Sequence, residues 1–174
     1  MRRLVPFALA ALLTIGFVLP VNAGGRPEMF HNEPIEQQFE SCGFGVSLED
    51  THAAGKFFIF PVDRHGNQKH FATGGFKSTL WNTEHPEISI DITFHGRLEY
   101  VVHPDGTQTV KLAGQAIHWL DDPADAAMYG LTTGLYLITG NLRMVTDLDW
   151  FALGPVEMHG ARVRDLCAEL APPA

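Results

Sequence analysis

Hydrophobic and polar residues alternate most regularly between Ile88 and His103. Every second position in this stretch is apolar or glycine, namely Ile88, Ile90, Ile92, Phe94, Gly96, Leu98, Tyr100 and Val102. The positions between them are mostly polar, and a period of two predicts a β-strand with one buried face. At roughly 3.3 Å per residue the strand would be about 50 Å long, so we expect it to curve as the strands of barrels do.

The turn sequence His103-Pro104-Asp105-Gly106-Thr107 follows this strand and predicts a β-hairpin. A two-residue loop would bring Lys111 and Gln115 onto the apolar face. A three-residue loop with a left-handed glycine instead matches the apolar faces and sets Glu99 opposite Lys111, so we favour that register. It pairs Tyr100 with Val110, Leu98 with Leu112, Gly96 with Gly114, Phe94 with Ala116 and Ile92 with His118. The facing glycines predict a sharp bend, and His118 would point inward.

Turn residues divide the rest of the chain into further strands and one helix. The stretch 121–128 has aspartates at its start and a proline in its first turn, as helix starts do. The expected strands are 42–50, 56–62, 69–81 with a bulge or bend at Gly74-Gly75, two between 131 and 147 around Gly140-Asn141, and 156–166. These strands and the long hairpin predict an all-β fold, a single antiparallel β-barrel of about eight strands with one short helix. A β-sandwich is the alternative.

The chain begins with a segment typical of a secretory signal peptide. Arg2 and Arg3 precede a largely apolar run from residue 4 to residue 19, and Val21-Asn22-Ala23 supplies the small residues of a cleavage site. A membrane anchor is the alternative, but the run is short for a bilayer span, so we expect no stable span after cleavage. We therefore divide the chain into a signal peptide (1–23), an extended lead-in (24–40) and a β-barrel domain (41–170). The expected location is extracellular or in the cell envelope.

The sequence contains only two cysteines, Cys42 and Cys167, near the two ends of the expected barrel. An isolated pair in a secreted chain favours a disulfide bond. Closing so long a loop would stabilise the fold by on the order of 4–5 kcal/mol in the chain-entropy model. A catalytic or metal-binding thiolate is the alternative, although no Cys-x-x-Cys motif is present.

Charge and motif content exclude several function classes. The formal net charge is −8, so binding to nucleic acid or to an anionic membrane by bulk charge is not expected. Nine histidines raise the question of a metal site, but there is no His-x-His or His-Glu-x-x-His motif. His95 and His103 would lie about 26 Å apart on one strand, too far to share an ion. We expect no metal site, no cofactor and no catalytic residues, because nucleophile-elbow, phosphate-loop and glycosidase-type carboxylate patterns are absent.

Two short motifs frame the expected barrel: Cys42-Gly43-Phe44-Gly45-Val46 and Asp165-Leu166-Cys167-Ala168-Glu169-Leu170. Together with the signal segment, this frame resembles a group of small secreted actinobacterial proteins without an assigned activity. The resemblance implies the compartment, the β fold and the disulfide, and it implies no site residues. Lipocalin-like barrels are similar in architecture only, because a Gly-x-Trp opening signature is missing.

Small closed barrels can hold one ligand in their interior. On the favoured register, the expected ligand-binding side chains are Phe94, Leu98, Tyr100, Leu112 and His118. Our hypothesis is a secreted, disulfide-closed barrel that binds a small apolar ligand without catalysis; a solid core built from the same residues is the alternative. Two other functions stay open, a barrel-type isomerase with His118 as acid or base and a structural or adhesive envelope protein with a contact patch at 57–60. The sequence does not fix the oligomeric state.

Overall fold

The computed structural model describes residues 28–32, 36–40 and 42–173. The expected signal peptide, 1–23, and residues 24–27 and 33–35 of the expected lead-in lie outside the described residues. The described lead-in forms two short strands, β1 (Glu28–Asn32) and β2 (Glu36–Phe39), and Phe39 is buried. These described parts of the lead-in therefore belong to the sheet.

The all-β prediction is confirmed. The remaining strands are β3 (Val46–Ile59), β4 (Gln68–Asn82), β5 (Ser89–Val102), β6 (Gln108–Leu120), β7 (Gly134–Thr146) and β8 (Glu157–Asp165). Helix α1 (Pro123–Met128) is the expected short helix, with Asp122 accepting a hydrogen bond from Ala124 N at its start. A second helix, α2 (Leu166–Leu170), was not expected. It begins at the last residue of the expected strand 156–166, where Asp165 caps it by accepting a hydrogen bond from Ala168 N.

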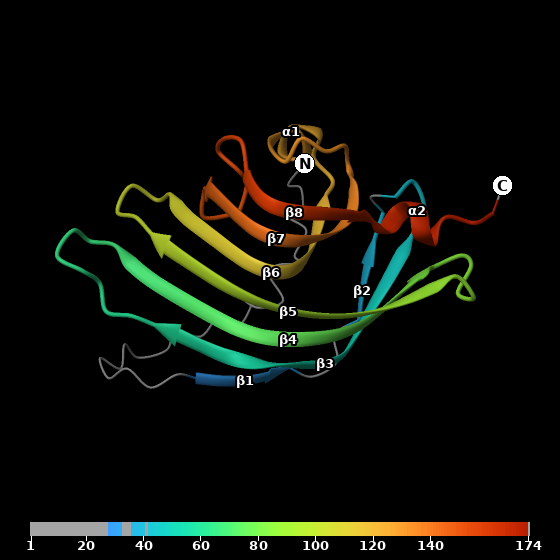
Figure 1. Cartoon of the computed structure of the whole chain (residues 1–174), viewed down its shortest axis with the longest axis horizontal. Helices are drawn as coiled ribbons and strands as arrows, with labels where there is room; N and C mark the ends of the chain where they lie inside the picture. The colour runs from blue at the N-terminus through green and yellow to red at the C-terminus, as the bar shows by residue number, and fades with distance from the viewer. Residues whose placement is uncertain (1–27, 33–35, 41, 174) are drawn as a thin grey trace, which may run out of the picture.

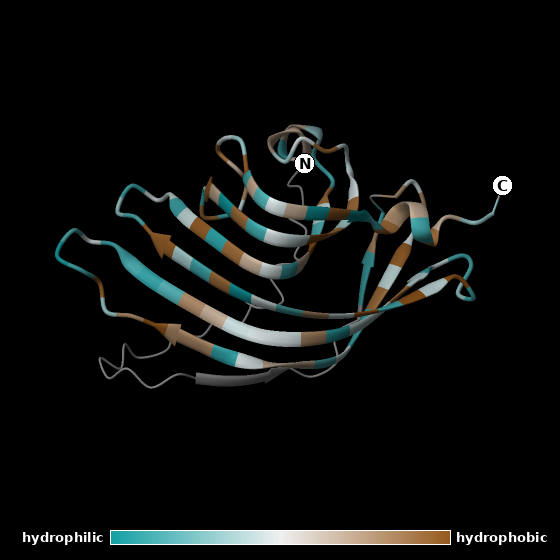
Figure 2. Ribbon diagram, viewed as in Figure 1, coloured by the Kyte–Doolittle hydropathy of each residue, from teal (hydrophilic) through white to brown (hydrophobic). Residues whose placement is uncertain are grey.

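The strands form one strongly curved antiparallel sheet in the order β1-β3-β4-β5-β6-β7-β8, with β2 also paired to β3 (Figure 1). Among the described strands this order is open, with no pairing between β1 and β8, so the expected antiparallel barrel takes the form of a half-barrel. Hydrophobic and hydrophilic residues alternate along the strands (Figure 2). That alternation fixes which face is buried, but it carries no information on whether the first and last strands meet.

The structure has two long strands where the sequence pattern predicted four short ones. The segments 42–50 and 56–62 belong largely to the single strand β3, which continues through a register shift between Asp50 and His52. The region 131–147 contains the single strand β7, whose glycine at 140 is paired within the sheet and does not form a turn. In both places a polar residue or a glycine interrupts the pattern without ending the strand, because a bulge or bend accommodates it.

The β5–β6 hairpin has the favoured register from Val102–Gln108 down to Gly96–Gly114. Lys111 Nζ lies 3.7 Å from Glu99 Oε1, as the pairing of opposite charges requires. The ladder ends at the glycine pair, so the expected pairs Phe94–Ala116 and Ile92–His118 are wrong. His118 is paired instead with Tyr136 on β7.

Five glycines on five neighbouring strands form one continuous row across the sheet. The successive pairs are Gly55–Gly74, Gly74–Gly96, Gly96–Gly114 and Gly114–Gly140. A Cβ at position 74 would lie 2.6 Å from the carbonyl oxygen of Ala54, so side chains there would push the strands apart. The row is where the sheet can bend without side chains in the way.

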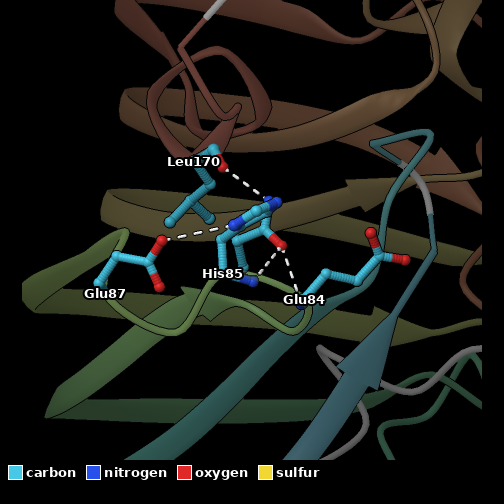
Figure 3. Close-up of polar contacts among 5 residues, drawn as sticks. Glu84, His85, Glu87 and Leu170 are labelled. Atoms are coloured by element: carbon cyan, nitrogen blue, oxygen red, sulfur yellow. Dashed lines mark hydrogen bonds and ion pairs between the residues drawn. The ribbon is translucent and has the colours of Figure 1, made fainter.

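One cluster of buried hydrophobic residues lies at the end of the sheet that carries α2. Leu166 and Leu170 of α2 are fully buried against residues of β3, β4 and β7. The expected disulfide is confirmed, and Cys42–Cys167 ties this end of the sheet together. Buried Asn82 donates a hydrogen bond to the carbonyl oxygen of Leu170 and accepts from the backbone amides of Glu84 and His85 (Figure 3). Asn82 thereby joins the β4–β5 turn to α2.

Candidate functional site

A cavity of about 100 Å³ lies beside the glycine row, between the strands that the row crosses. Backbone of Gly74 and Gly96 forms part of its wall. Most of the rest is apolar, and the main apolar side chains are Leu48, Ala72, Phe94, Leu98, Leu112 and Ile117. We call this space the apolar cavity.

The apolar cavity follows from the local sequence. Because β5–β6 pairing ends at Gly96–Gly114, the two strands no longer run side by side beyond that point. Small residues, Ala72 and Ala116, stand where larger side chains would fill the gap. The bend and the small residues together leave a hollow that a regular sheet with large inward residues would not have.

Five polar residues also line this mostly apolar space, namely Gln37, Asp50, Thr73, Arg97 and Gln115, and Asp50 supplies the carboxyl group among them. Asp50 is 9 % exposed and accepts a hydrogen bond from Ser78 Oγ at 2.5 Å. Burial raises the pKa of Asp50 above its ordinary value, and the hydrogen bond from Ser78 partly offsets this. A buried carboxyl group at an apolar wall is suited to fixing the orientation of a ligand that carries one polar group.

Three of the five expected ligand-binding residues, Phe94, Leu98 and Leu112, line the apolar cavity. Tyr100 does not. Its ring stacks on His70 with centroids 4.5 Å apart and meets Trp150 edge-on at 5.2 Å. Burial raises the pKa of Tyr100 to about 12, so the phenol stays neutral and serves the core.

His118 points inward as expected and is 5 % exposed, but it lines a different cavity, together with Tyr129. The reason is the early end of the β5–β6 ladder. Beyond Gly114, β6 buries both of its faces, and His118 lies on the face that packs toward α1. The expected five-residue set is therefore divided between two cavities and the core.

Asp50 is not among the site residues expected from the sequence. Its position held a usable indication, because Asp50 shares the parity of Val46 and Leu48 in an alternating strand and so had to face the core. An acid on the buried face of a strand is unusual and points to a site or to a strong local partner.

Within the described ranges, no group of three or more His, Cys, Asp or Glu side chains is arranged to hold a metal ion. None of the helices in the described part of the chain is long and apolar enough to cross a membrane. The arrangement at the apolar cavity can enclose an apolar group and present a few polar groups to it, among them the carboxyl group of Asp50 and the guanidinium group of Arg97. Comparisons with known protein families, curated proteins and solved structures give no match to this chain.

Proposed function

We propose that the protein binds a small apolar ligand, without catalysis, in the apolar cavity. The observation that carries this proposal is the cavity itself, which lies at the bend of the half-barrel and is lined by Phe94, Leu98 and Leu112. Concave, mostly apolar spaces with a few polar groups are the usual form of small-molecule sites.

Burial of apolar surface would supply the affinity. A ligand that loses roughly 200 Å² of apolar surface to the wall gains about 5 kcal/mol before the costs of association. Asp50 would set the orientation by accepting a hydrogen bond from a hydroxyl or amide group of the ligand. The ligand class is therefore a mainly apolar molecule that carries a hydrogen-bond donor.

Native mass spectrometry of the protein purified from its natural source tests this proposal. We expect an adduct that is lost on denaturation, and the released molecule should partition into organic solvent. The proposal fails if the protein is bare as isolated and stays bare after incubation with a total lipid extract. A variant with the cavity filled, Ala116→Phe, is the control, since it should carry no adduct while keeping the fold.

We also propose that the mature protein acts outside the cytoplasm. The disulfide is compatible with an oxidising compartment, and the segment 1–23 has the composition of a signal peptide. Intact-mass analysis of the exported protein should give a mature chain beginning at Gly24. A chain that retains residues 1–23 would contradict the proposal.

A second candidate is a barrel-type isomerase, favoured by one observation. Asp50 is a buried carboxyl group with a raised pKa in an apolar cavity, which is how acid–base residues are often placed. His118, the group first considered for this role, lines the other cavity. Recovery of the bound molecule chemically unchanged after prolonged incubation with the protein would argue against turnover.

A third candidate is adhesion through exposed apolar side chains. Ile59, Phe60 and Val62 are 43 %, 42 % and 59 % exposed at the end of β3 and in the loop after it. The expected patch at 57–60 is thus half present, because Phe57 and Phe58 are partly buried. If the function is adhesive, the Phe60→Ser variant should lose surface binding and the Ala116→Phe variant should keep it.

A further inference from the structure

A second cavity, of about 90 Å³, lies between β6, α1 and the loop that follows β7. Its chemically distinctive lining residues are His118, Asp121, Asp125, Tyr129, Asp149 and Trp150. It differs from the apolar cavity in composition, since it combines acids, aromatic rings and one histidine. We call it the acidic cavity.

His118 is one of the polar residues that line the acidic cavity, as is Trp119, whose Nε1 is also buried and without a hydrogen-bond partner in the described part of the chain. The Nε2 atom of His118 is buried, and within the described part of the chain it has no hydrogen-bond partner. Burial lowers the pKa of His118 to about 4, so the imidazole is neutral at ordinary pH. A neutral imidazole with its proton on Nδ1 accepts a hydrogen bond at Nε2, and leaving such an atom unpaired costs about 1–3 kcal/mol. A ligand with an N–H donor would satisfy it.

The charged residues that line the acidic cavity are all acids. Three carboxyl groups, from Asp121, Asp125 and Asp149, line the acidic cavity, and no lysine or arginine is among its described lining residues. The pKa of Asp125 is raised, first by burial and then by repulsion from Asp122, Asp121 and Asp147. The acidic cavity therefore has uncompensated negative potential, which favours a positively charged ligand.

Aromatic side chains supply the rest of the wall. Tyr129 lies with its ring centroid 5.4 Å from that of His118, and Trp150 and Phe151 come from the loop after β7. Trp150 has a φ of 69°, in the left-handed region that non-glycine residues rarely adopt, so the loop backbone is held in a costly conformation. Aromatic faces next to carboxylates are the usual surroundings of bound organic cations.

An inorganic cation fits less well. The described His, Cys, Asp and Glu residues include no group of three or more arranged around one point as metal ligands. An inorganic ion would also find few ligand atoms on the side of the cavity formed by the aromatic rings of Tyr129, Trp150 and Phe151. A ligand with both an apolar body and an ammonium group would use the aromatic rings, the carboxyl groups and the imidazole of the wall.

We propose that the acidic cavity binds a small organic ammonium ion, with its N–H group donating to His118 Nε2, its charge facing Asp125 and Asp149, and its apolar part against Tyr129 and Trp150. The proposal does not depend on the apolar cavity, although Leu112 and Ile117 contribute to the walls of both cavities.

An NMR titration at pH 7 with benzylammonium tests the proposal, with benzyl alcohol as the uncharged probe of similar shape. We expect saturable shifts of the Trp150 indole signal, at least tenfold tighter binding of benzylammonium than of benzyl alcohol, and weaker binding in higher salt. Equal affinity for the two probes, or no saturable shift of Trp150, would overturn the proposal.

Substitutions then locate the site. His118→Phe should weaken benzylammonium binding about tenfold through the lost hydrogen bond, and Asp149→Asn should weaken it through the lost charge. Asp105→Asn, which removes the same charge from an exposed turn, is the matched control and should have no effect. If the His118→Phe variant does not fold, the comparison of benzylammonium binding by Asp149→Asn and Asp105→Asn tests the proposal by itself. Equal binding by these two variants would refute the assignment. Shifts of Leu48 and Leu98 without Trp150 would place the probe in the apolar cavity and also refute it.

Discussion

Gly96 lies directly opposite Gly114, and the β5–β6 ladder ends at this pair. Gly114 has a φ of 111°, and a Cβ there would lie 2.3 Å from the carbonyl oxygen of His95. The close approach lets β6 turn away from β5 toward α1. The apolar cavity opens beside this bend, and beyond it β6 carries His118 to the acidic cavity. The glycine pair therefore determines where both cavities lie.

The Gly114→Ala variant should be strongly destabilised. The left-handed backbone and the clash with His95 act together, so we expect a loss of about 3 kcal/mol in the free energy of unfolding. Gly106→Ala is the matched control, because Gly106 has a φ of 83° with nothing within 4 Å of the added Cβ. It should lose only about 1 kcal/mol. Equal losses in urea unfolding would show that the close approach at position 114 is not needed.

Removing the disulfide should destabilise the fold markedly. The bond joins positions 125 residues apart, and its loss in Cys42→Ala/Cys167→Ala should lower the free energy of unfolding by about 4 kcal/mol. Chemical reduction of the unsubstituted protein should reproduce that loss in the same urea titration. A change below about 1 kcal/mol in both cases would mean that Leu166 and Leu170 hold this end closed without the bond.

Stability should fall on acidification because of His118. The folded protein keeps this ring neutral down to a pKa of about 4, whereas the unfolded chain takes up a proton near 6.5. The stabilising contribution is therefore complete above pH 6.5 and is lost as pH falls toward 4, by about 3 kcal/mol. Asp121, Asp125, Tyr129 and Asp149 are the other titratable groups in the same cavity, and the raised pKa of Asp125 acts in the opposite sense.

Unfolding at a series of pH values isolates this contribution. The free energy of unfolding of His118→Phe should fall less steeply between pH 6.5 and 4.5 than that of the unsubstituted protein. His159→Phe, at an exposed position of β8, should leave the pH dependence unchanged. Parallel curves for all three proteins would contradict the assignment to His118.

Asn82 should be important for stability although it lies far from either cavity. It is 1 % exposed, donates to Leu170 O at 3.0 Å and accepts from two backbone amides of the β4–β5 turn. Asn82→Ala leaves these groups unpaired, and we expect a loss of about 2–3 kcal/mol. Asn141→Ala, at an exposed position, should change stability by less than about 0.5 kcal/mol. Similar losses of stability in the two variants would contradict a stabilising role for the Asn82 hydrogen bonds drawn in Figure 3.

Local pattern was enough to predict part of this structure. The turn at 103–107 and the charge pair Glu99–Lys111 fixed the hairpin register, and the two cysteines indicated their own bond. The proline and aspartates at 121–123 indicated α1. The hairpin register and the helix depend on residues that are close in the sequence. The disulfide depends on a pairing for which the sequence offers each cysteine a single partner.

The features that could not be predicted depend on geometry across several strands. Gly96 and Gly114 indicated a bend, but whether pairing continued beyond them depended on the remaining glycines of the row. The end of β5–β6 pairing at these glycines is the reason why His118 and Phe94 line two different cavities. The open edge of the half-barrel also depends on how much the whole sheet curls, which alternation does not encode.

The most direct test of the apolar site is methyl NMR with toluene as the probe. In protein labelled at Leu and Ile methyl groups, we predict saturable shifts at Leu48 and Leu98, which line the apolar cavity and not the acidic one. Leu166 and Leu170, buried in the core at α2, should not shift. The cavity-filling variants Ala116→Phe and Ala72→Leu should abolish the response. Absence of saturable shifts at Leu48 and Leu98 up to the solubility of toluene, or equal shifts in the filled variants, would contradict ligand binding at this cavity.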